Sequence, residues 1–570
     1  EKNNFVFIGP PSSAIDSMGD KISSKKIAEE AGVSIVPGFL GEISDEKQGA
    51  KIATDIGFPV LIKASAGGGG KGMRVVSSES ELKQSLISSQ NEAEKSFGDK
   101  RVFIEKYITN PRHIEIQVLA DKFGRCIYLG ERECSIQRRN QKVIEEAPSP
   151  FLDTQLRKKM GEQAVSLAKA VNYSSAGTVE FIVDEEKNFY FLEMNTRLQV
   201  EHPVTELITG LDLVELMIKV AYGEQLKLSQ EEIKLEGWAL ESRIYAEDPY
   251  RNFLPSTGRL KKFKPPQVSN EENKIIRNDC GVIEGGEISI YYDPMISKLC
   301  SWGKTREEAI SFMQEALDDY QIEGIGQNIP FLHSVYRNRD FCKGNISTAF
   351  IENNYPEGFK GEKLSEEERK QLVALITFVH HTKNLRDQAI SGRLDAFEGN
   401  PDEEYFVKFE DQWLATKIQE YDDEQTVTVN KLPLRFVTSW KPGDTLIKAK
   451  FDKKNVVASL RFQDQGIAVE YRGSLNTAIV CNETEKELFK FIKEPEVIDT
   501  SKFLLCPMPG LLVSISVNEG DAVEEGQILC SVEAMKMENV FRAEKKGIVK
   551  KVNVAAGDSL AVDDIIIEFE

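Results

Sequence analysis

The chain has 570 residues, of which 41% are hydrophobic and 29% are charged, and its formal net charge is -20. A chain of this length folds into several domains, and its negative charge excludes polyanionic partners, so we expect no nucleic-acid and no membrane partner. The sequence has no apolar run of about 18 residues that could cross a membrane. Its 8 cysteines form no CxxC pair and no zinc-like spacing, which favours reduced thiols and an intracellular location.

The first 350 residues mix helical and strand-like patterns, as in α/β or α+β enzymes. Residues 5–10 resemble a strand, and because the chain starts with Glu1 rather than Met we expect a longer N-terminal part. A helix is predicted over residues 21–32. Strands are predicted over residues 59–63, 114–119 and 178–183.

Four consecutive glycines at positions 67–70 lie between Lys63 and Lys71. The run formally fits GxGxxG, but a strand-like segment, 73–76, follows where a dinucleotide-binding helix should begin. A Walker A loop is also excluded, because glycine follows Lys71. The pattern of strand, glycine loop and strand predicts a hairpin lid whose backbone N–H groups approach phosphate, with a flexible surface turn as the alternative.

Two strand-like segments, 178–183 and 189–194, are separated by a polar turn. If the hairpin turns at residues 186–187, Glu180 lies directly opposite Glu193. Like charges so placed are destabilising unless a cation lies between them, and Mg²⁺ suits such oxygen ligands. Asn195, on the same face, could be a further ligand. A slip of one residue would separate the two glutamates, and a solvated acidic hairpin is the alternative.

The next polar cluster follows directly in residues 195–203. Arg197 could hold a planar anion through its guanidinium fork, and Glu201 could act as a general base. His202 precedes a proline and is also compatible with a purely structural role.

From about residue 360 the pattern changes. Ser365 and Glu368 form a capping box, and apolar residues at helical spacing follow, which predicts one long helix. Short alternating segments, including 405–409, 426–429 and 467–471, then predict an antiparallel β domain without an obvious catalytic cluster.

The last 70 residues contain an internal repeat, in which Gly520-Asp521 recurs as Gly557-Asp558. Two related halves predict a flattened β barrel with pseudo-two-fold symmetry, with Gly-Asp supplying the turns. Between the halves lies Ala-Met-Lys-Met, with Lys536 expected at an exposed hairpin tip between two exposed methionines. An ordinary surface lysine is the alternative.

This last segment resembles the biotinyl domain of biotin-dependent carboxylases, which are modified on the lysine of Ala-Met-Lys-Met. Residues 1–350 resemble the ATP-grasp enzyme biotin carboxylase, without most of its N-terminal domain. The resemblance rests on short motifs that occur in the family order: Met18-Gly19-Asp20-Lys21, Glu105-Lys106-Tyr107, Pro111-Arg112-His113-Ile114-Glu115, Gln137-Arg138-Arg139, Glu145-Glu146-Ala147-Pro148 and Tyr291-Tyr292-Asp293-Pro294-Met295. Asn140 departs from the histidine of some family members.

The resemblance implies a role for each matching residue. ATP would be bound by Lys21, Lys63, Gly68, Gly69, Glu105, His113 and Gln137. Mg²⁺ or Mn²⁺ would be held by Glu180, Glu193 and Asn195. Bicarbonate would be held by Lys142, Arg197, Gln199 and Val200. The catalytic set would be Glu201 as base, Arg243 against the biotin enolate, Lys142 and Arg197, with biotin attached to Lys536.

The implied architecture is multidomain α+β. It has a biotin carboxylase over 1–350 with a lid at about 36–107, a subunit-interaction domain of one helix in an antiparallel barrel over 351–500, and a biotin carrier over 501–570. The middle region is most similar to the α subunits of propionyl-CoA carboxylases, which implies a separate carboxyltransferase β subunit, an α6β6 dodecamer and a biotin protein ligase as partners. The family places such chains in the bacterial cytoplasm or the mitochondrial matrix. Alternatives are a 3-methylcrotonyl-CoA or other acyl-CoA carboxylase, a different ATP-grasp ligase, or a non-catalytic biotin carrier.

Overall fold

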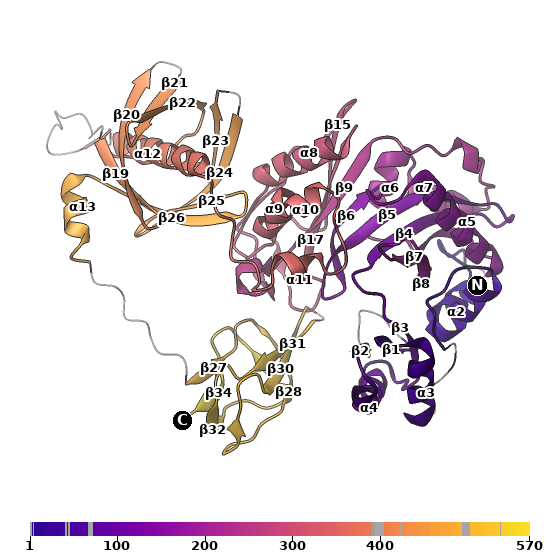
Figure 1. Ribbon diagram of the computed structural model, residues 1–570. Coiled ribbons are helices and arrows are strands. Elements are labelled where there is room, and N and C mark those ends of the chain that lie inside the picture. The colour runs from indigo at the N-terminus through magenta and orange to yellow at the C-terminus, as the bar shows by residue number, and fades with distance from the viewer. Residues whose placement is uncertain are drawn as a thin grey trace.

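The computed structural model describes residues 3, 5–39, 41, 43, 46–66, 72–389, 391–392, 404–421, 424–452, 454–492, 502–535 and 537–570. Figure 1 shows three bodies in chain order: a large-sheet body (to residue 354), a barrel body (366–489) and a C-terminal body (503–570). Within these ranges no helix is long and apolar enough to cross a membrane. All eight cysteines are free thiols.

The large-sheet body is organised by nine strands in the order β14-β15-β17-β9-β6-β5-β4-β7-β8, with every neighbouring pair antiparallel. The strands are β4 (Arg112–Ala120), β5 (Cys126–Arg138), β6 (Gln141–Ala147), β7 (Ser175–Val183), β8 (Phe189–Asn195), β9 (Trp238–Tyr245), β14 (Ser269–Glu271), β15 (Lys274–Cys280) and β17 (Met295–Gly303). The helices that pack on them are α5 (Thr154–Ala170) on β4 and β5, α6 (His202–Thr209) on β5, β6 and β9, α7 (Leu213–Tyr222) on β7, and α8 (Arg306–Asp319) on β9 and β17.

Smaller elements complete this body. The helices are α1 (Ser12–Gly19), α2 (Lys21–Glu30), α9 (Ile329–Arg337), α10 (Arg339–Cys342) and α11 (Phe350–Asn354), with 3-10 turns η1 (Gln230–Glu232) and η2 (Pro249–Arg251). The short strands are β10 (Glu247–Asp248), β11 (Leu254–Pro255), β12 (Gly258–Arg259), β13 (Lys262–Lys264), β16 (Glu287–Ile288) and β18 (Gln321–Glu323). The helix predicted at 21–32 is α2, whose first turn is capped by the Asp20 side chain.

The strand predicted at residues 5–10 was wrong. The described residues of this run form no strand, and the Phe5 side chain is 79% exposed. A strand needs a neighbour to satisfy its backbone groups, and no pairing with this run occurs in the described part of the chain.

The segment predicted to be a lid contains a small three-stranded sheet. Its order is β2-β1-β3, and the antiparallel pair of β1 (Val60–Ala64) and β2 (Arg74–Val76) confirms the predicted strand, loop and strand. Helices α3 (Glu46–Ile56) and α4 (Glu79–Phe97) pack with this sheet, which ends with β3 (Val102–Lys106). The predicted glycine loop, including Gly68 and Gly69, lies outside the described residues.

The β7–β8 hairpin places Glu180 directly opposite Glu193, as predicted. The assumed uninterrupted register was wrong, because Phe181 pairs with Phe191 and the register shifts between this pair and the glutamates. Leu192 is thus the extra residue of a β-bulge, which brings the two carboxylates into opposition.

The barrel body is a closed eight-stranded barrel in which consecutive strands are neighbours, with the long helix α12 (Glu366–Gln388) inside it. The strands are β19 (Glu404–Phe409), β20 (Gln412–Tyr421), β21 (Glu424–Val429), β22 (Leu432–Thr438), β23 (Leu446–Phe451), β24 (Lys454–Gln463), β25 (Gly466–Tyr471) and β26 (Ser474–Cys481). The capping box of Ser365 and Glu368 starts α12, as predicted. A second helix, α13 (Glu483–Phe489), was not predicted.

The C-terminal body consists of two four-stranded sheets, β27-β34-β32-β29 and β31-β30-β28-β33. The strands are β27 (Phe503–Leu505), β28 (Gly510–Ile515), β29 (Ala522–Val523), β30 (Ile528–Ala534), β31 (Met537–Arg542), β32 (Gly547–Val552), β33 (Ser559–Leu560) and β34 (Ile565–Phe569). The two copies of the repeat make the same turn: Asp521 accepts from the Asn518 N–H and Asp558 from the Ala555 N–H, each at 2.8 Å. This confirms the predicted flattened barrel of two related halves.

Lys536 lies between β30 and β31 and outside the described residues. The expectation that its preceding neighbour, Met535, is exposed was wrong. Met535 is only 1% exposed, because it is buried against the large-sheet body rather than turned to water.

Candidate active site

A polar cavity of about 330 Å³ lies against the middle strands of the large sheet. It brings together these predicted residues: Lys21, Lys63, His113, Gln137, Lys142, Glu180, Glu193, Asn195, Arg197, Gln199, Val200, Glu201 and Arg243. Further lining comes from residues not predicted to be functional: Met73, Asn140, Gln141, Leu192, Tyr245 and Asp293. Glu105 is buried and does not line the cavity, but it binds the lining residue Lys63, and Gly68, Gly69 and Lys536 are outside the described residues.

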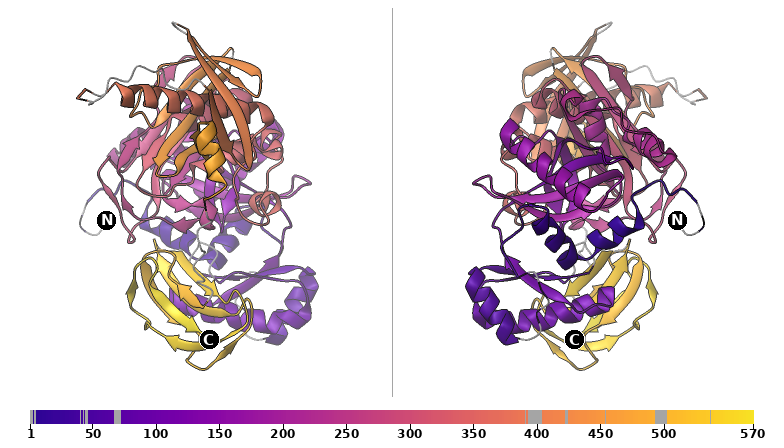
Figure 2. Two further views of the ribbon diagram at one scale, coloured as in Figure 1. Left: turned by 90° about the vertical axis from the view of Figure 1, so that its left-hand side faces the viewer. Right: turned by 90° about the vertical axis from the view of Figure 1, so that its right-hand side faces the viewer.

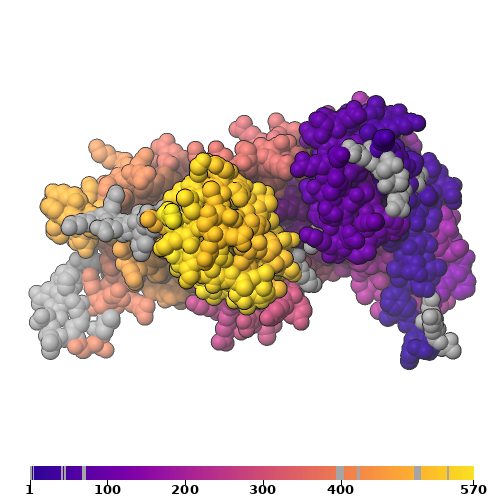
Figure 3. Space-filling view, turned by 90° about the horizontal axis from the view of Figure 1, so that it is seen from below, coloured from indigo at the N-terminus to yellow at the C-terminus, as the bar shows by residue number. Residues whose placement is uncertain are grey.

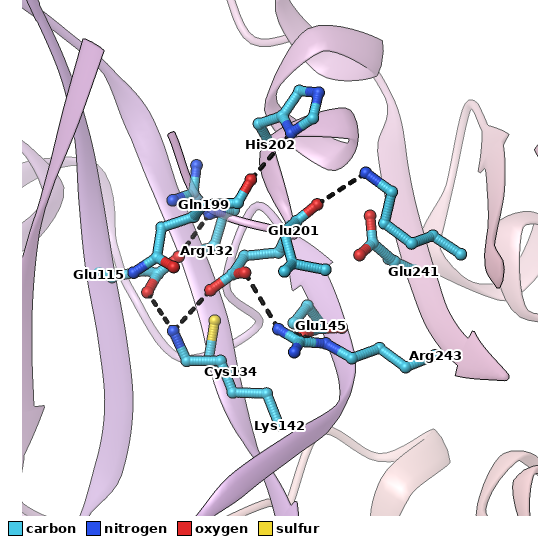
Figure 4. Close-up of polar contacts among 12 residues, drawn as sticks. Glu115, Arg132, Cys134, Lys142, Glu145, Gln199, Glu201, His202, Glu241 and Arg243 are labelled. Atoms are coloured by element: carbon cyan, nitrogen blue, oxygen red, sulfur yellow. Dashed lines mark hydrogen bonds and ion pairs between the residues drawn. The ribbon is translucent and has the colours of Figure 1, made fainter. Parts of the chain in front are cut away.

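The centre of the cavity is a charged cluster around Glu201 (Figure 4). Glu201 is the N-cap residue of α6 and is fully buried, and it accepts from Lys142 Nζ at 2.5 Å and from Arg243 Nη2 at 3.0 Å. Burial alone would raise the pKa of Glu201, but Lys142, Arg243 and Arg132 outweigh it and hold that pKa well below its ordinary value. Glu201 is therefore ionised, as a proton acceptor must be.

Lys142 joins three carboxylates at this point. Its Nζ donates to Glu115 at 2.6 Å and to Glu180 at 3.1 Å, in addition to Glu201. Burial would lower the pKa of Lys142, but these carboxylates raise it well above its ordinary value. The side chain thus stays cationic and can attract an anion into the cavity.

Two members of this cluster, Glu115 and Arg132, were missed by the sequence reasoning. Both are fully buried, and Arg132 Nε donates to Glu115 at 2.5 Å. A usable signal was present, because polar His113, Glu115 and Gln117 alternate with apolar residues along β4. Residues two apart share a face of a strand, so this polar face marks the side of the sheet that bears the site.

The opposed carboxylates of Glu180 and Glu193 both line the cavity. Glu180 accepts from the Asn195 side-chain amide at 2.8 Å, so Asn195 lies in contact with the pair. Lys142 and His113 outweigh burial and lower the pKa of Glu180 below its ordinary value. Two carboxylates with an amide beside them are a donor set that fits Mg²⁺ or Mn²⁺.

At the lid side, Glu105 is enclosed by two lysines. Lys63 Nζ donates to Glu105 at 2.8 Å, and Lys25 forms a second ion pair with it. Burial would raise the pKa of Glu105, but Lys63 and Lys25 lower it to about 2. Lys25 was not predicted, although it lies one helical turn after Lys21, so both face the same side of α2. Lys21 itself reaches Glu193, at 3.7 Å.

Four other predicted residues contact one another in two hydrogen-bonded pairs. Gln137 lies 2.9 Å from His113 Nδ1, and Arg197 Nη1 donates to Gln199 at 2.8 Å. His202 turns away from the cavity lining, with Nδ1 2.8 Å from the Gln199 carbonyl, which fits the structural role considered for it.

Consecutive parts of the chain match four protein families. Residues 20–229 match the carbamoyl-phosphate synthase L chain ATP binding domain, and residues 241–353 match the biotin carboxylase C-terminal domain. Residues 372–494 match the propionyl-coenzyme A carboxylase BT domain, and residues 503–569 match the model described as biotin-requiring enzyme. A biotin carboxylase from Campylobacter jejuni, solved with an ATP analogue, superposes with a TM-score of 0.60 and is 46% identical, covering 62% of this chain and 77% of its own. Fold and site therefore define an ATP-grasp biotin carboxylase joined to a biotinyl domain.

Relatives that match nearly the whole of this chain identify its family more closely. The propionyl-CoA carboxylase alpha chain of Ruegeria pomeroyi is 53% identical over 100% of this chain and 86% of its own length. The mitochondrial propionyl-CoA carboxylase alpha chain of Mus musculus is 49% identical over 99% of this chain and 78% of its own. The chain belongs to the family of propionyl-CoA carboxylase alpha chains.

Proposed function

We propose that this chain carboxylates biotin attached to Lys536, using ATP and bicarbonate, as the first half-reaction of a propionyl-CoA carboxylase. The observation that carries the proposal is the Lys142–Glu201–Arg243 cluster, which shares one cavity with the Glu180–Glu193 pair. A proton acceptor, fixed cations and a metal-binding carboxylate pair are the groups that phosphoryl transfer to bicarbonate requires.

Bicarbonate would occupy the space between Lys142 and Arg197, with Gln199 and Val200 beside it. Because bicarbonate is an anion, it would compete with Glu201 for the positive charge of Lys142. Glu201 would then be less stabilised in its ionised form and more basic. Glu201 then accepts the bicarbonate proton, and the oxyanion attacks the γ-phosphate of ATP to give ADP and carboxyphosphate.

ATP would lie between the lid and the large sheet, with Lys21, Lys63, His113 and Gln137 as its contacts in the cavity. Glu105 would hold Lys63 in place, since its ion pair fixes the ammonium group. Glu180, Glu193 and Asn195 would hold Mg²⁺ or Mn²⁺, which when bound supplies positive charge to the phosphates.

Beside Arg243, carboxyphosphate would split into CO₂ and phosphate. The phosphate would take the ureido N–H proton of the biotin on Lys536, and that nitrogen would then bond to CO₂. The Arg243 guanidinium lines the cavity and is oriented by Glu145, which accepts from its Nε at 2.6 Å. A fixed cation there stabilises the negative charge that develops on the acceptor.

A separate carboxyltransferase β chain would complete the reaction, because the region between the carboxylase and the biotinyl body matches the BT domain of propionyl-coenzyme A carboxylase. The barrel body is the segment that matches a BT domain, and we assign it to β-chain binding within an α6β6 dodecamer. A biotin protein ligase would load Lys536, in the bacterial cytoplasm or the mitochondrial matrix.

The function is tested with the native complex captured on monomeric avidin. Labelled bicarbonate is offered with propionyl-, acetyl- and 3-methylcrotonyl-CoA side by side. Preferred labelling of propionyl-CoA is expected. Preference for 3-methylcrotonyl-CoA would contradict the proposed substrate, propionyl-CoA. A biotinylated complex that labels none of the three would contradict the carboxylase function.

Glu201→Gln tests the proton acceptor. The amide keeps the shape of the side chain but cannot accept the bicarbonate proton, so bicarbonate-dependent ATP hydrolysis is expected to fall by on the order of 10²-fold or more. The control is Glu224→Gln, an exposed glutamate on the same body. Full bicarbonate-dependent activity in Glu201→Gln would contradict the assignment.

A further inference from the structure

The C-terminal body contacts the large-sheet body through the residue that precedes the biotinylation position. The Met535 N–H donates to the Ile290 carbonyl at 2.8 Å. The Met535 side chain is 1% exposed and belongs to the apolar cluster of the large-sheet body that includes Ile288 and Ile296, not to the core of its own body. Met535 therefore binds across the boundary between the two bodies.

The segment that receives Met535 leads directly into the catalytic cavity. Ile290 is followed by Tyr291 and Tyr292, which are 76% and 72% exposed, and then by Asp293, which lines the cavity. The residue after Met535 is Lys536. Met535 therefore binds the large-sheet body at Ile290, three residues before Asp293 of the cavity wall.

A second contact lies on another loop of the large-sheet body. Arg251 Nη2 donates to the Pro507 carbonyl at 3.0 Å, and Leu254 packs against the apolar core of the C-terminal body. Pro507 opens the Pro-Met-Pro-Gly segment that precedes β28. Two separated points of contact fix the orientation of a small domain, whereas a single point would leave it free to rotate.

The C-terminal body also lies on the same side of the large sheet as the lid segment. Figure 1 shows the C-terminal body below the large sheet, and Figure 3 shows it beside the lid when the molecule is viewed from below. The side views in Figure 2 place the lid and the C-terminal body at the same end of the molecule. The segment that would cover ATP and the body that would carry biotin therefore lie at the same end of the molecule.

We propose that Met535 of the C-terminal body, together with Arg251 and Leu254 of the large-sheet body, forms the docking interface that presents Lys536 to the catalytic cavity. Met535 is then a positioning residue, not a catalytic one. The proposal rests on the proposed function and deepens it, since it assigns to one methionine of Ala-Met-Lys-Met a role in delivery to the carboxylase.

The interface is small, as delivery requires. In the described part of the chain it includes one buried methionine, one partly buried leucine and two hydrogen bonds to carbonyls. The carrier must leave after each carboxylation, so tight binding would slow turnover. Covalent attachment supplies a high effective concentration, which lets a weak contact suffice.

Substitutions on the large-sheet side test the docking without touching the sequence around Lys536. In the full chain with its β partner, Arg251→Ala combined with Leu254→Ala is expected to lower carboxylation of attached biotin by on the order of tenfold, with carboxylation of added free biotin unchanged. The matched control is Arg259→Ala, because Arg259 also donates to a backbone carbonyl, that of Gly285, at 3.1 Å but within its own body.

Met535→Ala is expected to show the same split between attached and free biotin, and Met535→Leu to restore most of the attached-biotin rate, because leucine conserves apolar volume. Binding to avidin measures the biotin load, and rates are expressed per biotin. Unchanged attached-biotin carboxylation in the Arg251→Ala/Leu254→Ala variant would overturn the docking interface. Absence of free-biotin carboxylation in the unsubstituted chain would instead count against the proposed function.

Discussion

Glu145 and Glu241 stand directly opposite each other on β6 and β9, and both are fully buried. Arg243 binds Glu145, whereas Glu241 accepts from the Cys300 thiol at 3.4 Å, and one oxygen of each carboxyl has no hydrogen-bond partner among the described residues. Burial raises the pKa of Glu145 to about 7 and, together with repulsion by Glu145, raises the pKa of Glu241 well above its ordinary value. The pair therefore retains a proton near neutral pH, which leaves a single negative charge to orient Arg243.

Glu241→Gln tests this shared proton. Both carboxyls have a folded-state pKa above the ordinary value of 4.5, so the folded chain binds more protons and loses stability as pH rises from about 4.5 through about 7. Glutamine resembles the protonated acid and does not titrate. The variant is expected to match the unsubstituted chain near about pH 5 and to melt at a higher temperature near about pH 8.

Thermal unfolding of the full chain across that pH range measures the effect, with the exposed Glu224→Gln as control. A melting-temperature difference that does not change with pH would show that the two carboxyls share no proton.

At the same scale, sequence reasoning found the opposed carboxylates of the β7–β8 hairpin but missed Glu115, although Glu115 alternates with apolar residues along β4. The opposition of Glu180 and Glu193 followed from counting outward from a turn. The bulge at Leu192 could not be predicted, because residues 189–192 are all aromatic or apolar and show no alternation that an extra residue would break. Glu115 and Arg132 were missed since a buried charge on a strand is stable only through a partner elsewhere in the chain, and pattern alone does not name that partner.

Among the elements, local signals predicted α12 better than they predicted any strand. The Ser365 capping box and the apolar spacing specify both the start of the helix and its buried face, because these interactions lie within one or two turns. Residues 5–10 had strand-like composition without a strand partner, and α13 carries its own capping box at Asn482 and Glu485 that the sequence reasoning overlooked. Helices and hairpins, whose contacts are local in the chain, were therefore within reach, whereas the order of the strands in the nine-stranded sheet was not.

Leu375→Ala tests the role of α12 as the core of the barrel. Leu375 is 1% exposed and lies in the apolar cluster shared by the helix and the strands. Truncation leaves a cavity and is expected to cost about 2–5 kcal/mol of the free energy of unfolding of the barrel body. Denaturant unfolding followed by the barrel's Trp413 and Trp440 measures it.

Arg386→Ala, an exposed position on the same helix, is the control and is expected to change the unfolding free energy by less than about 0.5 kcal/mol. Equal effects of the two substitutions would mean that α12 does not form the core on which the barrel folds.

For the whole molecule, the relative placement of the bodies depends on contacts that no local pattern encodes. The large-sheet and barrel bodies meet around a second cavity of about 650 Å³, where Arg472, in the turn after β25, binds Asp318 on α8 at 2.8 Å across a sequence separation of 154 residues. The sequence predicted the order and class of the bodies from their separate patterns. It could not predict their contact, since each partner alone reads as an ordinary charged residue.

Arg472→Ala tests whether this ion pair joins the two bodies. The Asp318 side chain is 4% exposed, and burial already raises the pKa of this carboxyl to about 6 although Arg472 opposes the shift. Removal of Arg472 leaves a buried carboxylate without its cation, at a cost of about 3 kcal/mol in the free energy of unfolding.

The sign of the pH dependence distinguishes this mechanism from a simple loss of packing. Because the folded pKa of Asp318 lies above its ordinary value of 3.8, stability falls as pH rises between these values, and without Arg472 the folded pKa rises further. The destabilisation in Arg472→Ala should accordingly be larger near about pH 8 than near about pH 5, and Asp318→Asn in the same chain should remove most of that difference. Melting temperatures of the full chain, with the exposed Arg435→Ala on the barrel as control, measure both effects. A loss in Arg472→Ala that is equal at the two pH values would mean that the guanidinium contributes only contact area, and that Asp318 does not couple the bodies through its charge.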